Sequence, residues 1–163
     1  MSKSDEWETP PELFELICAR QHGGFLLDAA ATVANRKAPK HLTDGLNMPW
    51  AAFTWCNPPY SQLPQWTAKA RAEAERGHPS TLLIPAYTDT GWWQDNVLGA
   101  STITFLTGRV TFWEDGKPGK WTARFPSVVV EFNPQNLFNP REPLVSWWDW
   151  KREWKSRLAN QTA

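Results

Sequence analysis

The chain has 163 residues, of which 41% are hydrophobic and 21% charged, and its 17 basic residues balance 17 acidic ones. This length suits one domain with a substantial core, and the composition is ordinary for a soluble globular protein. A formal net charge of zero argues against a protein that coats nucleic acid by charge alone, although it leaves room for local basic patches.

The N-terminal segment and the two cysteines indicate the cellular compartment and whether a metal site is expected. Residues 1–10 contain no hydrophobic stretch, and no apolar run approaches the roughly 20 residues of a membrane span. Cys18 and Cys56 lack metal-ligand spacing, and three scattered histidines do not complete a site. We therefore expect a cytoplasmic protein with reduced thiols, no metal and no membrane association.

Helix and strand signals alternate along the chain. Thr9, Pro10 and Glu12 resemble a capping box at the start of a helix over residues 9–23. Residues 25–28 form an apolar run that ends in an acid, as expected for a short buried strand. The remaining patterns predict an Ala-rich helix that ends at Gly77, a helix at 92–98, and strands at 40–43, 53–56, 81–85, 102–106, 109–113 and 127–132.

The last two predicted strands flank E-D-G-K-P-G-K, whose Asp-Gly and Pro-Gly pairs are turn signals. Strand–helix alternation followed by a hairpin predicts an α/β fold with a mostly parallel sheet and an antiparallel edge hairpin. We expect residues 1–133 to form the main domain. Residues 134–163 are expected to be a Trp-rich helical extension packed on or beside it, with Trp147, Trp150, Trp154 and Leu158 on one stripe and Lys151, Arg152 and Lys155 turned away.

Asp28 ends the first predicted strand. In open α/β sheets, ligands bind at the carboxyl ends of strands, where an acid often meets a ribose or a cationic group. The sequence D-A-A-A-T replaces a glycine-rich phosphate loop, so a ligand without phosphate is favoured. The alternative is that Asp28 only caps a turn or helix.

The second candidate site is Asn57-Pro58-Pro59-Tyr60, which follows the strand at 53–56. The Asn side-chain carbonyl and a proline carbonyl are acceptors, and together they can hold both protons of a planar amino group. Two acceptors localise the lone pair of such an amine and stabilise its developing positive charge, while Tyr60 can stack on the ring. The alternative is a plain turn that ends a strand.

An ordered series of motifs resembles the phage-type DNA N-6-adenine methyltransferase family. The series covers roughly residues 7 to 132 and comprises W-E-T-P (7–10), D-A-A-A (28–31), D-G-L (44–46) with Trp50, N-P-P-Y (57–60), P-A-Y-T-D-T-G-W-W (85–93), G-R-V-T-F (108–112) and F-P-S (125–127). The resemblance implies a Rossmann-like fold and transfer of a methyl group from S-adenosylmethionine to adenine N6 in DNA.

The resemblance also implies residue roles. The cofactor-binding set would be Trp7, Thr9 and Pro10 at the methionine end, Asp28, Ala29 and Ala30 after the first strand, Asp44 at the adenine amino group, and Asn57. The catalytic set would be Asn57, Pro58, Pro59 and Tyr60, with the Asn57 and Pro58 oxygens accepting the N6 protons.

Methylation of a base within duplex DNA requires that the base be flipped out. Candidate substrate-binding residues are Tyr60, Thr88, Asp89, Trp92, Arg109, Phe112, Lys117, Lys120 and Arg124. Several have plainer alternatives: Asp89 as a helix cap, Phe112 as a core residue and the basic residues as a solvated hairpin tip.

The expected partner is DNA, the expected state is a monomer or weak dimer, and a phage-encoded protein would act in the bacterial host cytoplasm. Other activities stay open, namely methylation of cytosine N4 or of a protein glutamine, because the same acceptors serve any planar amine. A nucleic-acid-binding module without catalysis is a further alternative.

Overall fold

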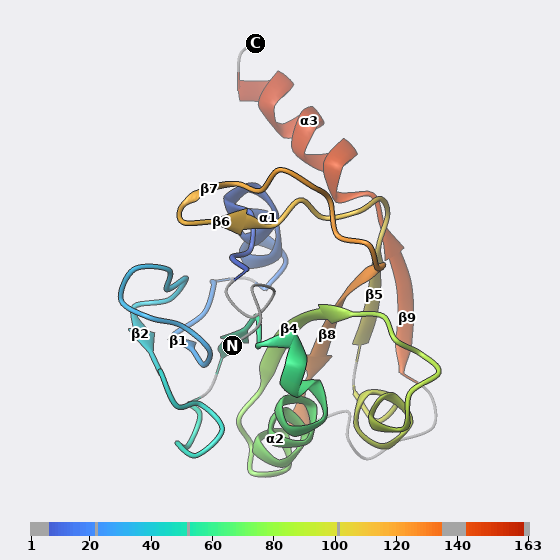
Figure 1. Cartoon of the computed structure of the whole chain (residues 1–163). Coiled ribbons are helices and arrows are strands. Elements are labelled where there is room, and N and C mark those ends of the chain that lie inside the picture. The colour runs from blue at the N-terminus through green and yellow to red at the C-terminus, as the bar shows by residue number, and fades with distance from the viewer. Residues whose placement is uncertain (1–6, 22, 52, 101, 135–142, 162–163) are drawn as a thin grey trace.

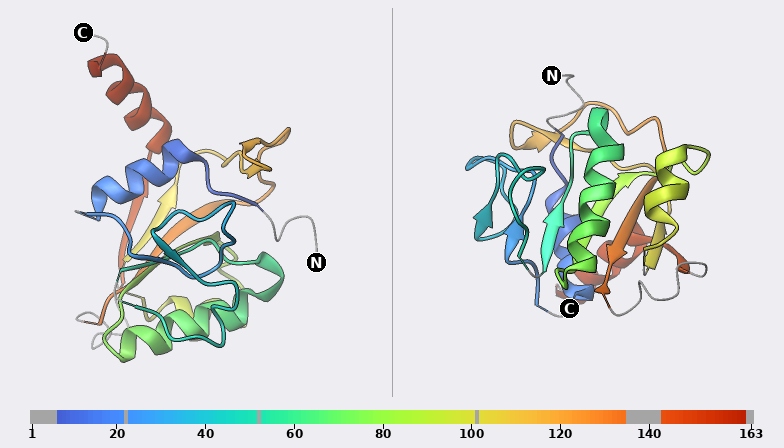
Figure 2. Two further views of the ribbon diagram at one scale, coloured as in Figure 1. Left: turned by 90° about the vertical axis from the view of Figure 1, so that its left-hand side faces the viewer. Right: turned by 90° about the horizontal axis from the view of Figure 1, so that it is seen from below.

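The structure is a computed structural model that describes residues 7–21, 23–51, 53–100, 102–134 and 143–161. A seven-stranded sheet in the order β2-β1-β3-β4-β8-β5-β9 runs through its centre, and helices lie on both faces (Figures 1 and 2). Its strands are β1 (Leu27–Asp28), β2 (Lys40–His41), β3 (Thr54–Cys56), β4 (Ser80–Pro85), β5 (Thr102–Leu106), β8 (Ser127–Phe132) and β9 (Leu144–Trp148).

The remaining elements are three α-helices, two short helical turns and a small hairpin. They are α1 (Pro11–Arg20), α2 (Leu63–Glu75), α3 (Trp150–Gln161), the 3-10 turn η2 (Tyr60–Gln62), the π-helical turn η3 (Trp93–Val97), and β6 (Trp113–Glu114) paired with β7 (Lys117–Pro118). Of the described helices, none is both long and apolar enough to cross a membrane.

Side chains that alternate along the central strands divide the core into two layers. On β4, Leu82 and Ile84 pack in the layer beneath α2 and η3, while Leu83 packs in the layer beneath α1. On β8, Val130 and Val129 divide in the same way. Because successive strand residues point to opposite faces, these continuous apolar runs are buried on both sides. The predicted α/β class is confirmed.

The antiparallel strand lies inside the sheet, which differs from the expected edge hairpin. β8 pairs antiparallel with β4 on one side and with β5 on the other, while the remaining pairs of the large sheet are parallel. Four of the six β8 residues are valine or phenylalanine, which suits a strand covered on both faces. The strand predicted at 109–113 does not form, and β6 begins only at Trp113 in the separate hairpin.

The first helix begins later than its sequence signals suggest. Residue Pro10 occupies the N-cap position of α1, and no side chain forms a capping bond there. Thr9 is buried with 1% of its surface exposed, so it faces the interior instead of capping the helix. The predicted capping box is therefore wrong, because tertiary burial of Thr9 overrides the local pattern.

The C-terminal residues contribute to the same sheet before they form a helix. β9 pairs in parallel with β5, and α3 starts only at Trp150. The Trp-rich stripe expected on one helix is thus shared between a strand and a helix, because Trp147 lies on β9. α3 then projects away from the body (Figures 1 and 2). The link over residues 135–142 lies outside the described residues.

Candidate active site

The carboxyl ends of β1 and β3 bring the two predicted site residues to one edge of the sheet. These strands are parallel neighbours, with Asp28 opposite Trp55. Asp28 is the last residue of β1, and Asn57 directly follows β3. Parallel strands end at the same edge, so the acid and the amide lie at one end of the sheet.

The Asn57 amide is held at both ends. Its Nδ2 donates a 2.7 Å hydrogen bond to the Trp7 carbonyl, and its Oδ1 accepts a 3.0 Å bond from the Tyr60 hydroxyl. The two prolines lead into η2, whose first residue is Tyr60, and this turn brings the phenol back over Asn57. An amide oxygen has two lone pairs, so Oδ1 retains one for a further donor.

Tyr60 lies within a cluster of aromatic rings. Its ring makes edge contacts with Trp7, Phe112 and Phe125 at centroid distances of 6.1, 6.0 and 5.5 Å. Burial above all, with Cys56 and Tyr87 nearby, raises the pKa of the Tyr60 hydroxyl well above its usual value. The hydroxyl is therefore a permanent donor at neutral pH.

This enclosure bears on the expected stacking roles. Edge contacts surround the Tyr60 ring, and Phe112 is 3% exposed with its face stacked on Trp7 at 5.2 Å and 12°. Of the two roles considered for Phe112, the structure shows packing in the core. Stacking of either ring on a base stays a prediction that requires Trp7 to move.

Asp28 is buried at the end of β1, where two backbone groups bond to it. Oδ2 accepts a 2.9 Å bond from the amide of Lys37, and Oδ1 accepts a 3.3 Å bond from the amide of Ala30. Burial raises the pKa of this carboxyl, and the two backbone bonds offset part of that effect. An ionised Asp28 would therefore be stabilised by a cationic or hydroxyl-bearing ligand.

A small hollow of about 20 Å³ lies beside Asp28 and Asn57. Thr9 and Trp7 also line it, together with Glu8, Ala30, Asn35, Lys37 and Trp55. The Thr9 Oγ1 atom is buried and has no hydrogen-bond partner among the described residues. A buried hydroxyl without a partner costs free energy, so this atom is suited to a polar ligand group.

Asp44 and its neighbours form a turn that packs on the loop after β1. A side chain on Gly45 would lie 2.0 Å from the Ala29 carbonyl oxygen, so only glycine fits there. The indole of Trp50 donates a 2.7 Å bond to the Gly45 carbonyl, which holds the turn in place. Asp44 itself is exposed, bonds to Asn47 at 2.9 Å, and is not among the residues that line the small hollow.

A larger hollow of about 870 Å³ lies on the other side of Trp7. Aromatic and basic side chains line it: Trp7, Tyr87, Phe112, Trp121 and Phe125 with Lys120 and Arg124, among others. Trp121 was not among the predicted site residues; its ring is 77% exposed, and the Lys120 ammonium lies 5.2 Å from the ring centroid. A tryptophan between basic residues on a loop was the only signal available.

The other predicted substrate residues lie around this face. Arg109, Lys117, Lys120 and Arg124 are exposed, as are Thr88 and Asp89, while Trp92 is half-buried. Trp92 precedes η3 and provides no side-chain cap, and the capping role considered for Asp89 stays a prediction. The Thr90 hydroxyl bonds to the Tyr87 carbonyl at 2.7 Å and holds the turn.

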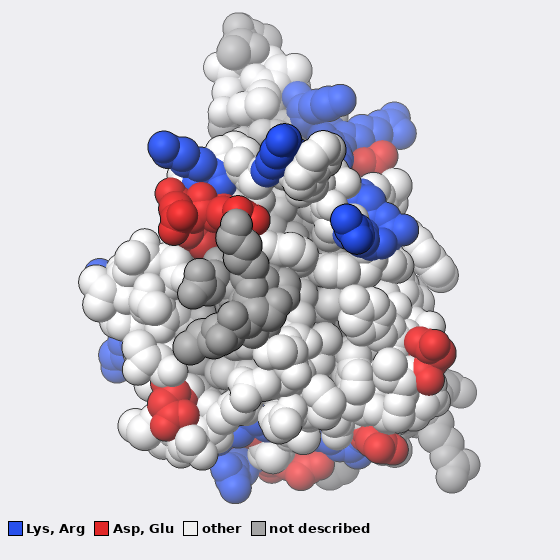
Figure 3. Space-filling view, in the orientation of Figure 1, with Lys and Arg blue, Asp and Glu red and all other residues white. Residues whose placement is uncertain are grey.

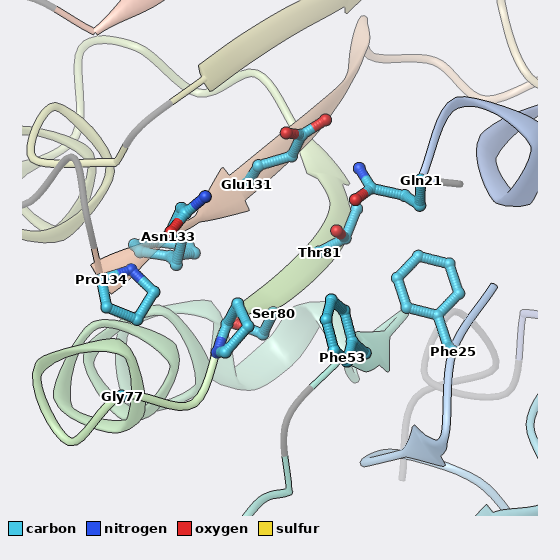
Figure 4. A pocket seen from close by; sticks show the side chains of 11 residues that line it. Gln21, Phe25, Phe53, Gly77, Ser80, Thr81, Glu131, Asn133 and Pro134 are labelled. Atoms are coloured by element: carbon cyan, nitrogen blue, oxygen red, sulfur yellow. The ribbon is translucent and has the colours of Figure 1, made fainter. Parts of the chain in front are cut away.

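A further pocket of about 520 Å³ lies at the opposite end of the sheet (Figure 4). Phe25, Phe53, Ser80 and Glu131 line it, at the amino ends of β3 and β4. None of the predicted site residues is part of it. Across the described residues, no group of three His, Cys, Asp or Glu side chains is arranged to hold a metal ion.

The fold and the site define a class. An open α/β sheet with an acid after β1 and Asn-Pro-Pro-Tyr after a neighbouring parallel strand is a Rossmann-like methyltransferase fold. More specifically, the chain belongs to the DNA N-6-adenine-methyltransferase (Dam) family, whose model matches residues 1–153.

One curated relative carries the same family name. The chain is 31% identical over 132 residues to a protein of Escherichia phage T1 named DNA N-6-adenine-methyltransferase. The match covers 78% of this chain and 55% of the relative, so the chain spans about half the length of the relative it matches.

Proposed function

We propose that this protein transfers a methyl group from S-adenosylmethionine to adenine N6 in DNA. The observation that carries the proposal is the fixed amide of Asn57, held by the Trp7 carbonyl and the Tyr60 hydroxyl beside the buried carboxyl of Asp28. This arrangement supports a hydrogen-bond acceptor for an amine beside a site suited to a cationic cofactor. Membership of the Dam family supports adenine N6 as the target.

The residues around the small hollow fit S-adenosylmethionine chemically. Asp28 offers a carboxylate to a ribose or amino group, Thr9 offers a buried hydroxyl without a partner, and the absence of a glycine-rich loop suits a ligand without phosphate. The cofactor, when bound, supplies the methyl group from its sulfonium.

A volume of about 20 Å³ is far below the several hundred Å³ of a typical cofactor site. Binding therefore requires the segment containing Trp7 and Thr9 to move outward, which releases the Asn57 amide from the Trp7 carbonyl and leaves the Tyr60 hydroxyl to orient it. That segment is attached to the hairpin by two 2.9 Å backbone bonds between Glu8 and Trp113. We expect the hairpin to move with it.

Asn57 supplies the catalytic acceptor in this proposal. Its Oδ1 accepts a hydrogen bond from one N6–H, and the Pro58 carbonyl is the predicted acceptor for the other; one of these two protons leaves to solvent after the methyl group has been transferred. Drawing both protons toward acceptors localises the nitrogen lone pair and stabilises the positive charge that develops there. Tyr60 lines the site, and its hydroxyl, which donates a hydrogen bond to Oδ1, also orients the amide.

The large hollow is the proposed receptor for the flipped base. Its aromatic lining suits a planar ring, and Lys120 and Arg124 at its rim suit the adjacent phosphates. Trp7 now covers the face of Phe112, so the base reaches that face only after the Trp7 indole has moved.

The test incubates the protein with labelled S-adenosylmethionine and unmethylated DNA, followed by digestion to nucleosides. We expect label in N6-methyladenine for the wild type and none for Asn57→Ala. Label in N4-methylcytosine or in protein would favour the alternative amine targets. DNA binding without any label, equal for both proteins, would favour a module without catalysis.

A further inference from the structure

Helix α3 is unusually exposed and unusually basic. Of its 12 residues, only Trp150 is buried. It carries the basic residues Lys151, Arg152, Lys155 and Arg157 and one acid, Glu153, in a chain whose formal net charge is zero. Core packing does not account for a polar helix that extends into solvent. Its positive charge therefore points to a binding role.

The single acid of α3 is already paired within the body. Glu153 Oε2 accepts a 2.8 Å bond from Arg20 of α1 and a 2.6 Å bond from the indole of Trp148. Arg157 lies 3.4 Å from Glu15, also on α1. These contacts anchor one side of α3 and occupy the Glu153 charge, which leaves the exposed side chains of Arg152 and Lys155 as surplus positive charge.

The base of α3 adjoins the loop that leads to the large hollow. The Lys151 ammonium donates a 2.8 Å bond to the carbonyl of Arg109, and Lys151 and Lys155 line a groove with Thr111 and one acid, Glu12. Lys and Arg side chains gather along the upper part of this face, beneath and beside the helix (Figure 3). We call Lys120, Arg124, Arg109, Lys151, Arg152 and Lys155 the basic rim.

We propose that α3 is an arm that binds the DNA phosphate backbone beyond the target base, as the outer part of the basic rim. This rests on the proposed function. A helix of 12 residues is about 18 Å long. Since the phosphates of one strand are spaced about 3.4 Å apart along the duplex axis, an arm that lies along this axis spans about five phosphates. It gives a chain without net charge a localised attraction for DNA.

The double variant Arg152→Gln/Lys155→Gln tests the arm, because both side chains are exposed and Lys151, which bonds to the loop, is kept. The matched control is Arg36→Gln/Lys40→Gln, which removes two exposed charges from β2 and from the loop before it. Fluorescence anisotropy with duplexes of increasing length, at several salt concentrations, gives the affinity and its salt dependence.

We expect the arm variant to reduce the slope of log Kd against log salt by one to two, because each lost phosphate contact contributes about 0.9. The duplex length beyond which affinity no longer increases should also be about five base pairs shorter for the arm variant than for the wild type. The control should match the wild type. Methylation at saturating DNA and the thermal shift on adding S-adenosylmethionine should be unchanged in both variants.

A salt slope equal to that of the wild type, with normal folding by circular dichroism, would overturn the arm proposal. Charge reversal in Lys155→Glu is the second variant, and an unchanged slope there would overturn it equally. If the wild type methylates DNA while both variants bind normally, only the arm fails. A wild type that binds DNA through α3 without transferring methyl groups would instead refute the proposed function.

Discussion

The hydroxyl of Tyr60 lies 3.0 Å from Oδ1 of Asn57 and donates a hydrogen bond to it. The motif therefore does more than place an amide and a ring at the end of a strand. Its fourth residue orients its first residue, and the Trp7 carbonyl orients the same amide from the other side.

Replacement of Tyr60 by Phe tests this orientation. The variant keeps the ring and its contacts but removes the hydroxyl, so we expect a two- to tenfold lower methylation rate, in line with the typical worth of one hydrogen bond of about 0.5–1.5 kcal/mol. Single-turnover kinetics at saturating DNA measures this. DNA affinity should be unchanged. A methylation rate equal to that of the wild type would show that Tyr60 only lines the site and that its hydroxyl does not orient Asn57.

Replacement of Thr9 by Val should raise stability and weaken cofactor binding. The Thr9 hydroxyl is buried without a partner, so its removal should stabilise the ligand-free protein by about 1 kcal/mol. The thermal shift produced by S-adenosylmethionine should shrink.

The matched control for this experiment is Thr67→Val. The Thr67 hydroxyl is equally buried but donates a 2.8 Å bond to the Leu63 carbonyl, so its loss should lower stability while leaving the cofactor shift intact. Equal losses of stability at both positions would contradict the role assigned to Thr9.

Trp121 should contribute to DNA binding, whereas Trp147 should not. Both rings are exposed, at 77% and 74%, but only Trp121 lines the large hollow. Since stacking of a base on an aromatic ring is worth about 1–3 kcal/mol, Trp121→Ala should weaken DNA binding at least fivefold. Trp121→Phe should restore most of it, and Trp147→Ala should bind as the wild type does.

Trp148 should contribute much more to stability than its neighbour Trp147. Trp148 is 5% exposed and packs in the layer beneath α1, whereas the neighbouring Trp147 only stacks on Phe105. We expect Trp148→Ala to cost about 3–5 kcal/mol of unfolding free energy and Trp147→Ala less than about 1. Chemical denaturation measures both, and a small loss for Trp148 would support residues 134–163 as a separable extension.

Glu131 should make stability depend on pH. Burial raises the pKa of this carboxyl, although Gln21 and Arg20 offset part of the effect. Its folded pKa therefore exceeds the unfolded one. The folded state gains stability when Glu131 is protonated, and this gain is lost as pH rises through the folded pKa.

Glu131→Gln should consequently become more stable relative to the wild type as pH rises from about 4.5 to 7. Thermal unfolding across that window, with the difference between the two proteins plotted against pH, is the measurement. A constant difference would show that Glu131 has an ordinary pKa.

The sequence was sufficient for those parts of the site that depend on strand ends. Asp28 and Asn57 each follow a recognisable apolar run, and the parallel pairing of their strands brings them together. The aromatic cluster around Tyr60 was harder to predict, because Trp7, Phe112 and Phe125 are distant in sequence and meet only through the fold.

Local patterns also misled where tertiary contacts prevailed. The spacing of Trp147, Trp150 and Trp154 fits a helix, yet Trp147 lies on β9 because that strand pairs with β5. Thr9 carries a capping signal, yet the chain buries it beside Asp28. The exposure of Trp121 leaves no trace in sequence, since an aromatic residue on a loop is as readily buried as exposed.

Trp7 lines both hollows, the small one beside Asp28 and the large one beside Phe125. A movement of this one side chain that admits the cofactor must also reshape the receptor for the base. Under the proposed function, displacement of the indole by one substrate would leave the site already opened for the other. We therefore expect the cofactor and the DNA each to raise the affinity of the protein for the other, through a single tryptophan.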